Sequence, residues 1–101
     1  MHQKRAKLIY KSKFIYKDGF IREMVLWQLP QRTKERAHSL KYRLYYGDHT
    51  GKCLVRYDNE TGKGDHKHIG YKEIIYNFET VEKLINDFLN DIKNFRRRNI
   101  K

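Results

Sequence analysis

The sequence predicts an α+β domain in which an antiparallel sheet of four to five strands is covered on one face by a C-terminal helix. Three observations carry this prediction. Apolar and polar residues alternate in several short segments of the first three quarters of the chain, which is typical of half-buried strands. Glycine-containing turns separate some of these segments, as they do in hairpins. The last quarter has one stripe of apolar residues at helical spacing, which is typical of a helix that packs on a sheet.

Residues 7–29 are predicted to form the first hairpin. One face of the segment 7–16 carries Leu8, Tyr10, Phe14 and Tyr16. The other face carries Lys7, Ile9, Lys11, Lys13 and Ile15, so we expect it to be basic and mostly solvated. Gly19 follows an aspartate and accepts the positive φ of a tight reversal. The return strand is predicted at 20–29 and ends at Pro30.

Two more strands follow a basic connection. Residues 31–39 contain Arg32, Lys34 and Arg36, and they could form either a solvated linker or an arm that contacts phosphate. The third strand is predicted at 40–46 and the fourth at 52–58, with a hairpin turn between them. A fifth short strand is predicted within 71–78, where a helical turn is the alternative.

The clearest element is the C-terminal helix. Thr80 is a favourable N-cap, and the apolar stripe that follows consists of Val81, Leu84, Ile85, Phe88, Leu89, Ile92 and Phe95. We expect this stripe to lie on one face of the sheet, while the other face exposes Lys, Arg and Tyr. The 101 residues suit a single domain over 1–101, with basic flexible ends at about 1–6 and 97–101.

The charge of the chain indicates a polyanionic partner. The sequence has 23 Lys and Arg against 12 Asp and Glu, a formal net charge of +11, which favours nucleic acid over a membrane. We expect no signal peptide and no membrane span, because no apolar segment is long enough. The single cysteine, Cys53, cannot form an internal disulfide and fits a reducing cytoplasm. Nucleic acid in the cytoplasm is therefore the expected partner.

Residues 57–70 hold most of the side chains that could do chemistry. The stretch contains three carboxylates, two lysines, two imidazoles and three glycines. It exceeds the usual connection of about 4–6 residues, and long ordered connections are often functional. His66 and His68 are spaced i, i+2, so both side chains point the same way if the segment is extended.

These residue types suit RNA cleavage by metal-independent acid–base chemistry. Attack by a ribose 2′-hydroxyl needs a base, an acid for the leaving oxygen and cations around the phosphorane. The residues predicted for these roles are His66 and His68 as acid and base, Lys63 and Arg43 as the cations, and Asp65, with Asp58 as the alternative, as the carboxylate that orients an imidazole. No cofactor is expected. We expect three other histidines to lie outside the site: His2, His38 and His49.

Three other interpretations stay open. A metal-dependent nuclease could use the two imidazoles together with Asp58, Glu60 and Asp65. A non-catalytic module could bind nucleic acid through Lys41, Tyr45, Arg56, Lys67, Arg96, Arg97 and Arg98. The stretch could also be structural, with Asp58 paired to Arg56 or Lys63 to hold a long loop.

The segment Gly62–Gly70 resembles the GKGDHxHxG signature of the TumE-like toxin family of prokaryotic toxin–antitoxin modules. The resemblance extends to four other segments: Asp18–Phe20, Trp27, Lys41–Gly47 and Leu54–Glu60. It implies a toxin, favours a ribonuclease of a type II system, and implies a cognate antitoxin that is acidic or DNA-binding. An acidic antitoxin would also neutralise the basic surface. The sequence leaves open whether the chain forms a homo-oligomer.

Overall fold

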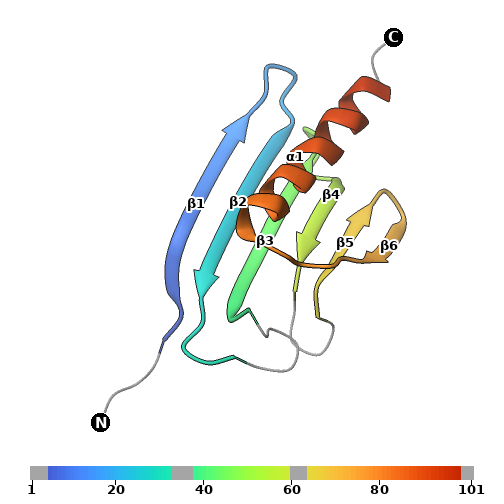
Figure 1. The fold of residues 1–101 in the computed structure, drawn as a ribbon. Helices are drawn as coiled ribbons and strands as arrows, with labels where there is room; N and C mark the ends of the chain where they lie inside the picture. Colours follow the sequence, from blue (N-terminus) through green and yellow to red (C-terminus); the bar gives the residue numbers. More distant parts are fainter. Residues whose placement is uncertain (1–4, 33–37, 60–63, 99–101) are drawn as a thin grey trace.

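The computed structural model describes residues 5–32, 38–59 and 64–98. Six strands lie in one antiparallel sheet, in the same order as in the sequence, and one helix follows them (Figure 1). Their bounds are Lys7–Ile15 for β1, Ile21–Gln28 for β2, Leu40–Gly47 for β3, Cys53–Asp58 for β4, His66–Ile69 for β5, Lys72–Ile75 for β6 and Val81–Arg98 for α1. The expected α+β architecture is therefore confirmed.

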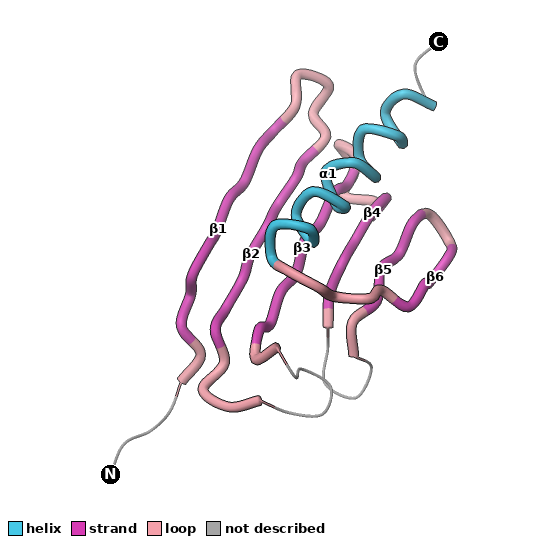
Figure 2. Tube along the Cα trace, viewed as in Figure 1, coloured by secondary structure: helices cyan, strands magenta, loops and turns pink. Residues whose placement is uncertain are grey.

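The helix α1 lies across one face of the sheet, as the apolar stripe predicted. We call this face the inner face and the opposite one the outer face. The main buried residues of the core, each at most 4 % exposed, are Met24, Leu26, Tyr42, Leu44, Tyr46, Val55, Tyr57, Leu84, Phe88 and Ile92. Figure 2 shows that β1 lies outside the area that α1 covers. Among the described residues, no helix is long and apolar enough to cross a membrane.

The helix begins where the sequence predicted and ends later. The Thr80 hydroxyl accepts a hydrogen bond from the Lys83 backbone N–H at 3.0 Å, which is the contact that defines an N-cap. The last turn contains Arg96, Arg97 and Arg98, and cations there are favoured by the helix dipole. Two arginines that we expected in a flexible tail therefore belong to α1.

Three buried tyrosines of the inner face donate hydrogen bonds to carboxylates. The pairs are Tyr42 with Asp65, Tyr57 with Asp91, and Tyr76 with Asp87. Burial raises the pKa of each phenol above its usual value, and the neighbouring carboxylate raises it further. Lys67 also donates to Asp91, at 3.2 Å. These contacts connect the strands to α1 and to the segment before β5.

The sheet has one strand more than the sequence predicted. The fifth strand expected within 71–78 is β6, and the helical turn considered there is wrong. The additional strand, β5, lies inside the stretch that we interpreted as a long connection. Its sequence, His-Lys-His-Ile, has no apolar alternation. Backbone pairing with β4 and β6 forms it all the same, since a ladder needs N–H and C=O groups rather than apolar side chains.

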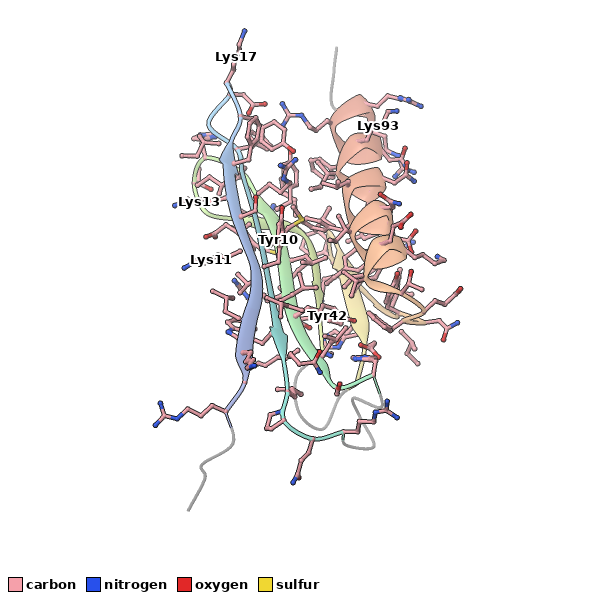
Figure 3. All side chains as sticks on the ribbon, turned by 60° about the vertical axis from the view of Figure 1, so that its left-hand side comes forward. Tyr10, Lys11, Lys13, Lys17, Tyr42 and Lys93 are labelled. Atoms are coloured by element: carbon pink, nitrogen blue, oxygen red, sulfur yellow. The ribbon has the colours of Figure 1, made fainter. Side chains whose placement is uncertain are left out.

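The predicted faces of two β1 residues are also wrong: Lys7, opposite Gln28, lies on the inner face, and Leu8 lies on the outer face. The register shifts between Leu8 and Tyr10, so that Leu8 lies opposite Trp27 while Tyr10 lies opposite Leu26. A bulge of this kind changes the face on which the following residues lie. Leu8 therefore shares the outer face with Lys11 and Lys13. Figure 3 shows these two lysines on the side of the sheet away from α1.

Candidate functional site

The strand register places the two predicted histidines beside the arginines of the outer face. His66 of β5 lies opposite Asp58 of β4, and Asp58 lies opposite Arg43 of β3. In the next row, His68 lies opposite Arg56. Cross-strand partners share a face, with Cβ atoms about 4.5–5.5 Å apart. Two short rows of charged and imidazole side chains thus meet on the outer face of β3, β4 and β5.

Both ring nitrogens of His66 have a close polar neighbour. Its Nδ1 lies 3.0 Å from the Gly64 carbonyl oxygen, and a carbonyl only accepts, so Nδ1 carries a hydrogen. Its Nε2 lies 2.7 Å from Asp58 Oδ1. Gly64 has a φ of +71°, a conformation that glycine adopts without strain. The turn before β5 therefore sets the orientation of the imidazole.

Asp58 is a buried carboxylate between the Arg56 guanidinium and the His66 imidazole. Its side chain is 5 % exposed, and its Oδ2 lies 3.0 Å from Arg56 Nε. The short contacts to Arg56 and His66 are not aligned as hydrogen bonds. Within the described residues Asp58 Oδ1 has no hydrogen-bond partner. A buried carboxylate is stable only when charge or hydrogen bonds compensate it, so Asp58 depends on these two neighbours.

His68 offers an imidazole nitrogen that nothing in the described residues occupies. Its side chain is 25 % exposed, and its Nε2 is buried without a hydrogen-bond partner in that part of the chain. The carboxylate of Glu73 lies 3.7 Å from the Nε2 of both imidazoles, too far for a hydrogen bond. The two imidazole rings lie 5.2 Å apart. The expectation that both point the same way is confirmed.

Basic and aromatic side chains border this group on the outer face. The Arg43 guanidinium lies over the Tyr45 ring at 5.3 Å, and the Lys41 ammonium lies over the Trp27 ring at 5.6 Å. A surface pocket borders Arg43 and Asp58 and is lined on one side by Trp27. This surface therefore combines cations with ring faces, the two features that bind single-stranded nucleic acid.

Asp65, expected to orient an imidazole of this group, lies elsewhere. It accepts a hydrogen bond from the Tyr42 hydroxyl at 2.6 Å, on the inner face, and contacts His38 Nε2 at 3.1 Å. The other nitrogen of His38 accepts from the Leu40 backbone N–H. Asp65 thus orients His38, which we had expected to have no role. The carboxylate beside His66 is Asp58.

Other predicted residues are also separated from the two histidines. Lys67 contacts Asp91 beneath α1. Arg96 donates to the Tyr46 hydroxyl at 2.7 Å and to Asp18 at 2.8 Å, on the inner face. Arg97 and Arg98 are exposed on α1. Lys63 and Glu60 lie outside the described residues.

One carboxylate near the site was missed from the sequence. Glu73 lies opposite His68 across the β5–β6 pair. The available signal was Gly70 and Tyr71, which form a two-residue connection between β5 and β6. A short glycine connection of this kind is typical of a hairpin.

Comparison with known proteins identifies the family of the chain. The family model described as Toxin TumE matches residues 5–96, which include all six strands and most of α1. No match was found among curated proteins or among solved structures. A toxin of this kind implies a cognate antitoxin as partner. Because the match covers nearly the whole chain, the protein belongs to the TumE toxin family.

Proposed function

We propose that this toxin is an endoribonuclease of a type II toxin–antitoxin system and that Asp58, His66 and His68 form its acid–base site. One observation carries the proposal. The strand register sets two imidazoles and a buried carboxylate on one sheet face with two guanidinium groups. In addition, His68 Nε2 has no hydrogen-bond partner in the described residues. A nitrogen of this kind can receive a proton from substrate.

The reaction that suits these groups is transfer of the phosphodiester to the neighbouring 2′-oxygen. His68 takes the 2′-hydroxyl proton as the bond from O2′ to phosphorus forms. His66 gives a proton to O5′ as the bond from phosphorus to O5′ breaks. Arg43 and Arg56 stabilise the charge of the phosphorane. The products are a 2′,3′-cyclic phosphate and a free 5′-hydroxyl, and solvent restores the starting protonation of the two histidines.

Asp58, the alternative named from the sequence, takes the orienting role first expected of Asp65. It lies 2.7 Å from His66 Nε2, close enough to keep the imidazole in one orientation. Lys63 remains a predicted phosphorane cation. Trp27 and Tyr45 offer ring faces to neighbouring bases, each worth roughly 1–3 kcal/mol in single-strand binding proteins.

The test is cleavage of an end-labelled single-stranded RNA by the purified chain, with and without EDTA. His68→Gln is compared with His49→Gln, because His49 is exposed in the β3–β4 turn. Loss of an acid or base lowers rates by roughly 10²–10⁴. We expect His68→Gln to lose cleavage to this extent, to bind RNA within a few fold of the unchanged protein, and to keep the same circular dichroism. His49→Gln should cut normally.

Three results would overturn the proposal. Normal cleavage by His68→Gln would remove His68 from the chemistry. Loss of cleavage in EDTA alone would show a metal-dependent nuclease. RNA that is bound but never cut would leave a basic nucleic-acid-binding module, whose toxicity would come from occupying its target.

A further inference from the structure

His66 Nε2 and Asp58 Oδ1 lie close together in the site. Since His66 Nδ1 donates to the Gly64 carbonyl, the neutral ring has its lone pair on Nε2. This nitrogen lies 2.7 Å from Asp58 Oδ1, an atom of a carboxylate, which also only accepts when ionised. Two acceptors at this distance repel each other unless a cation lies beside both. The cation can be a proton or a metal ion.

The third residue of the same cluster is His68, whose Nε2 has no hydrogen-bond partner in the described residues. The ligand atoms of Asp58, His66 and His68 all lie within 4.8 Å of one another. A tetrahedral zinc ion with bonds of about 2.1 Å holds its ligand atoms roughly 3.4 Å apart. The separations in the cluster extend from 2.7 Å to at most 4.8 Å, so they bracket this value. Small side-chain movements would bring all three atoms to bonding distance.

The surroundings of the cluster fit a metal site. Asp58 Oδ1 and His68 Nε2 are buried atoms without hydrogen-bond partners in the described residues, and the Asp58 side chain is only 5 % exposed. His66 is held by a backbone carbonyl and Asp58 by Arg56. Metal ligands commonly have such outer partners, which fix their orientation. Glu73, whose side chain is 52 % exposed, lies beside both imidazoles of the cluster.

The donor set indicates which ion would bind. Two imidazole nitrogens and one carboxylate oxygen suit Zn²⁺ and similar transition metals, whereas Mg²⁺ and Ca²⁺ prefer oxygen ligands alone. All three residues were among the metal ligands considered from the sequence, and within the described residues the cluster includes neither of the other two carboxylates considered there. Asp65 is hydrogen-bonded to Tyr42 on the inner face, and Glu60 lies outside the described residues.

We propose that Asp58, His66 and His68 bind Zn²⁺ or a chemically similar ion and that the bound ion inactivates the toxin. The proposal of metal binding rests only on the distances and burial of these three side chains. Inactivation rests on the proposed function, because an ion on both Nε2 atoms would occupy the nitrogens that transfer protons. The site would thus act as a zinc-sensitive off state of the ribonuclease.

Binding is tested on metal-stripped full-length protein without RNA. Co²⁺ is the first probe, because tetrahedral Co²⁺ absorbs visible light strongly, and Zn²⁺ is followed by calorimetry. We expect one ion per chain. Loss of an outer partner costs roughly 10- to 100-fold in affinity, so removal of a ligand in His68→Gln should cost at least this. Asp58→Asn should behave similarly, and His49→Gln should bind normally.

Circular dichroism checks that each variant is folded. If Asp58→Asn does not fold, His68→Gln still provides the test, because its side chain is partly exposed. The proposal is overturned if neither ion binds at one per chain, or if His68→Gln binds as tightly as the unchanged protein.

The consequence for activity is measured separately, by adding one equivalent of Zn²⁺ to the RNA cleavage assay. We expect cleavage to fall in the unchanged protein and to recover with EDTA. Faster cleavage with Zn²⁺ would overturn the inactivation. Metal binding by a protein that never cuts RNA would refute the ribonuclease and leave the metal site standing. Cleavage by a protein that binds no metal would refute the metal site and leave the ribonuclease standing.

Discussion

Raising the pH above about 10 is expected to destabilise the protein steeply, because three tyrosines stay protonated in the folded state. Burial raises the pKa of Tyr42, Tyr57 and Tyr76 above the ordinary 10.0, and each phenol also faces a carboxylate. All three are at most 8 % exposed. Above pH 10 the unfolded chain releases these protons while the folded chain keeps them. The unfolded state then binds fewer protons, so the free energy of unfolding falls as the pH rises.

The size of the effect follows from the number of tyrosines. Each proton contributes about 1.4 kcal/mol per pH unit once the pH is well above the unfolded pKa. Three tyrosines therefore remove about 4 kcal/mol by about pH 11. Total stabilities of small domains are about 5–15 kcal/mol. The loss is thus a large part of the stability at neutral pH.

Urea unfolding followed by circular dichroism across this pH range measures the slope directly. Tyr57→Phe should reduce the slope by about 1.4 kcal/mol per pH unit, whereas Tyr71→Phe, at a position 97 % exposed, should not change it. Near-ultraviolet absorbance counts the ionised tyrosines. The reasoning is refuted if all eight tyrosines ionise near pH 10 while the circular dichroism stays that of the folded protein.

Three further predictions concern packing and hydrogen bonds. Phe88→Ala, at a core position 0 % exposed, should lower the free energy of unfolding by about 3–5 kcal/mol in urea. The control Ile75→Ala, at a position 89 % exposed, should lower it by less than about 0.5 kcal/mol. Equal losses in the two variants would contradict the core assignment. Gly47→Ala would place its Cβ 2.1 Å from the Tyr45 hydroxyl and should cost about 1–3 kcal/mol through overpacking. Thermal unfolding should show a smaller loss when Tyr45 is also changed to alanine, and an unchanged loss would point to the backbone instead. Asn59→Ala removes two hydrogen bonds to the β3 backbone and should speed amide exchange there; unchanged exchange would show that the side chain is dispensable.

Side-chain periodicity accounts for the part of the fold that the sequence predicted. The apolar stripe and Thr80 located α1, and Gly19 located the first hairpin, because these signals depend on residues close in sequence. β5 carried no such signal. Its outward residues, His66 and His68, are polar, and its inward Lys67 extends beneath α1 to Asp91. A strand with polar residues on both faces looks like a loop.

The histidine pair was predictable for the same local reason, whereas Asp58 was named from the sequence only as the alternative to Asp65 for the carboxylate. A period of two places His66 and His68 on one face, and it also places Asp65 on the other face from His66. The partner Asp58 comes from β4 through the register of the β4–β5 pair. That register involves residues on both sides of a connection, and sequence spacing alone does not determine it.

The order of the strands has a consequence for how the toxin is made. Each strand pairs only with its neighbours along the chain, so each hairpin can form soon after its second strand is synthesised, and topologies of this kind tend to fold fast. The inner face of β4, however, is covered by α1, which follows every strand in the chain. Until Leu84 and Phe88 arrive, Asp58 and His66 lie on a sheet without a completed core. The proposed site would then gain the support of this core only after α1 has been synthesised.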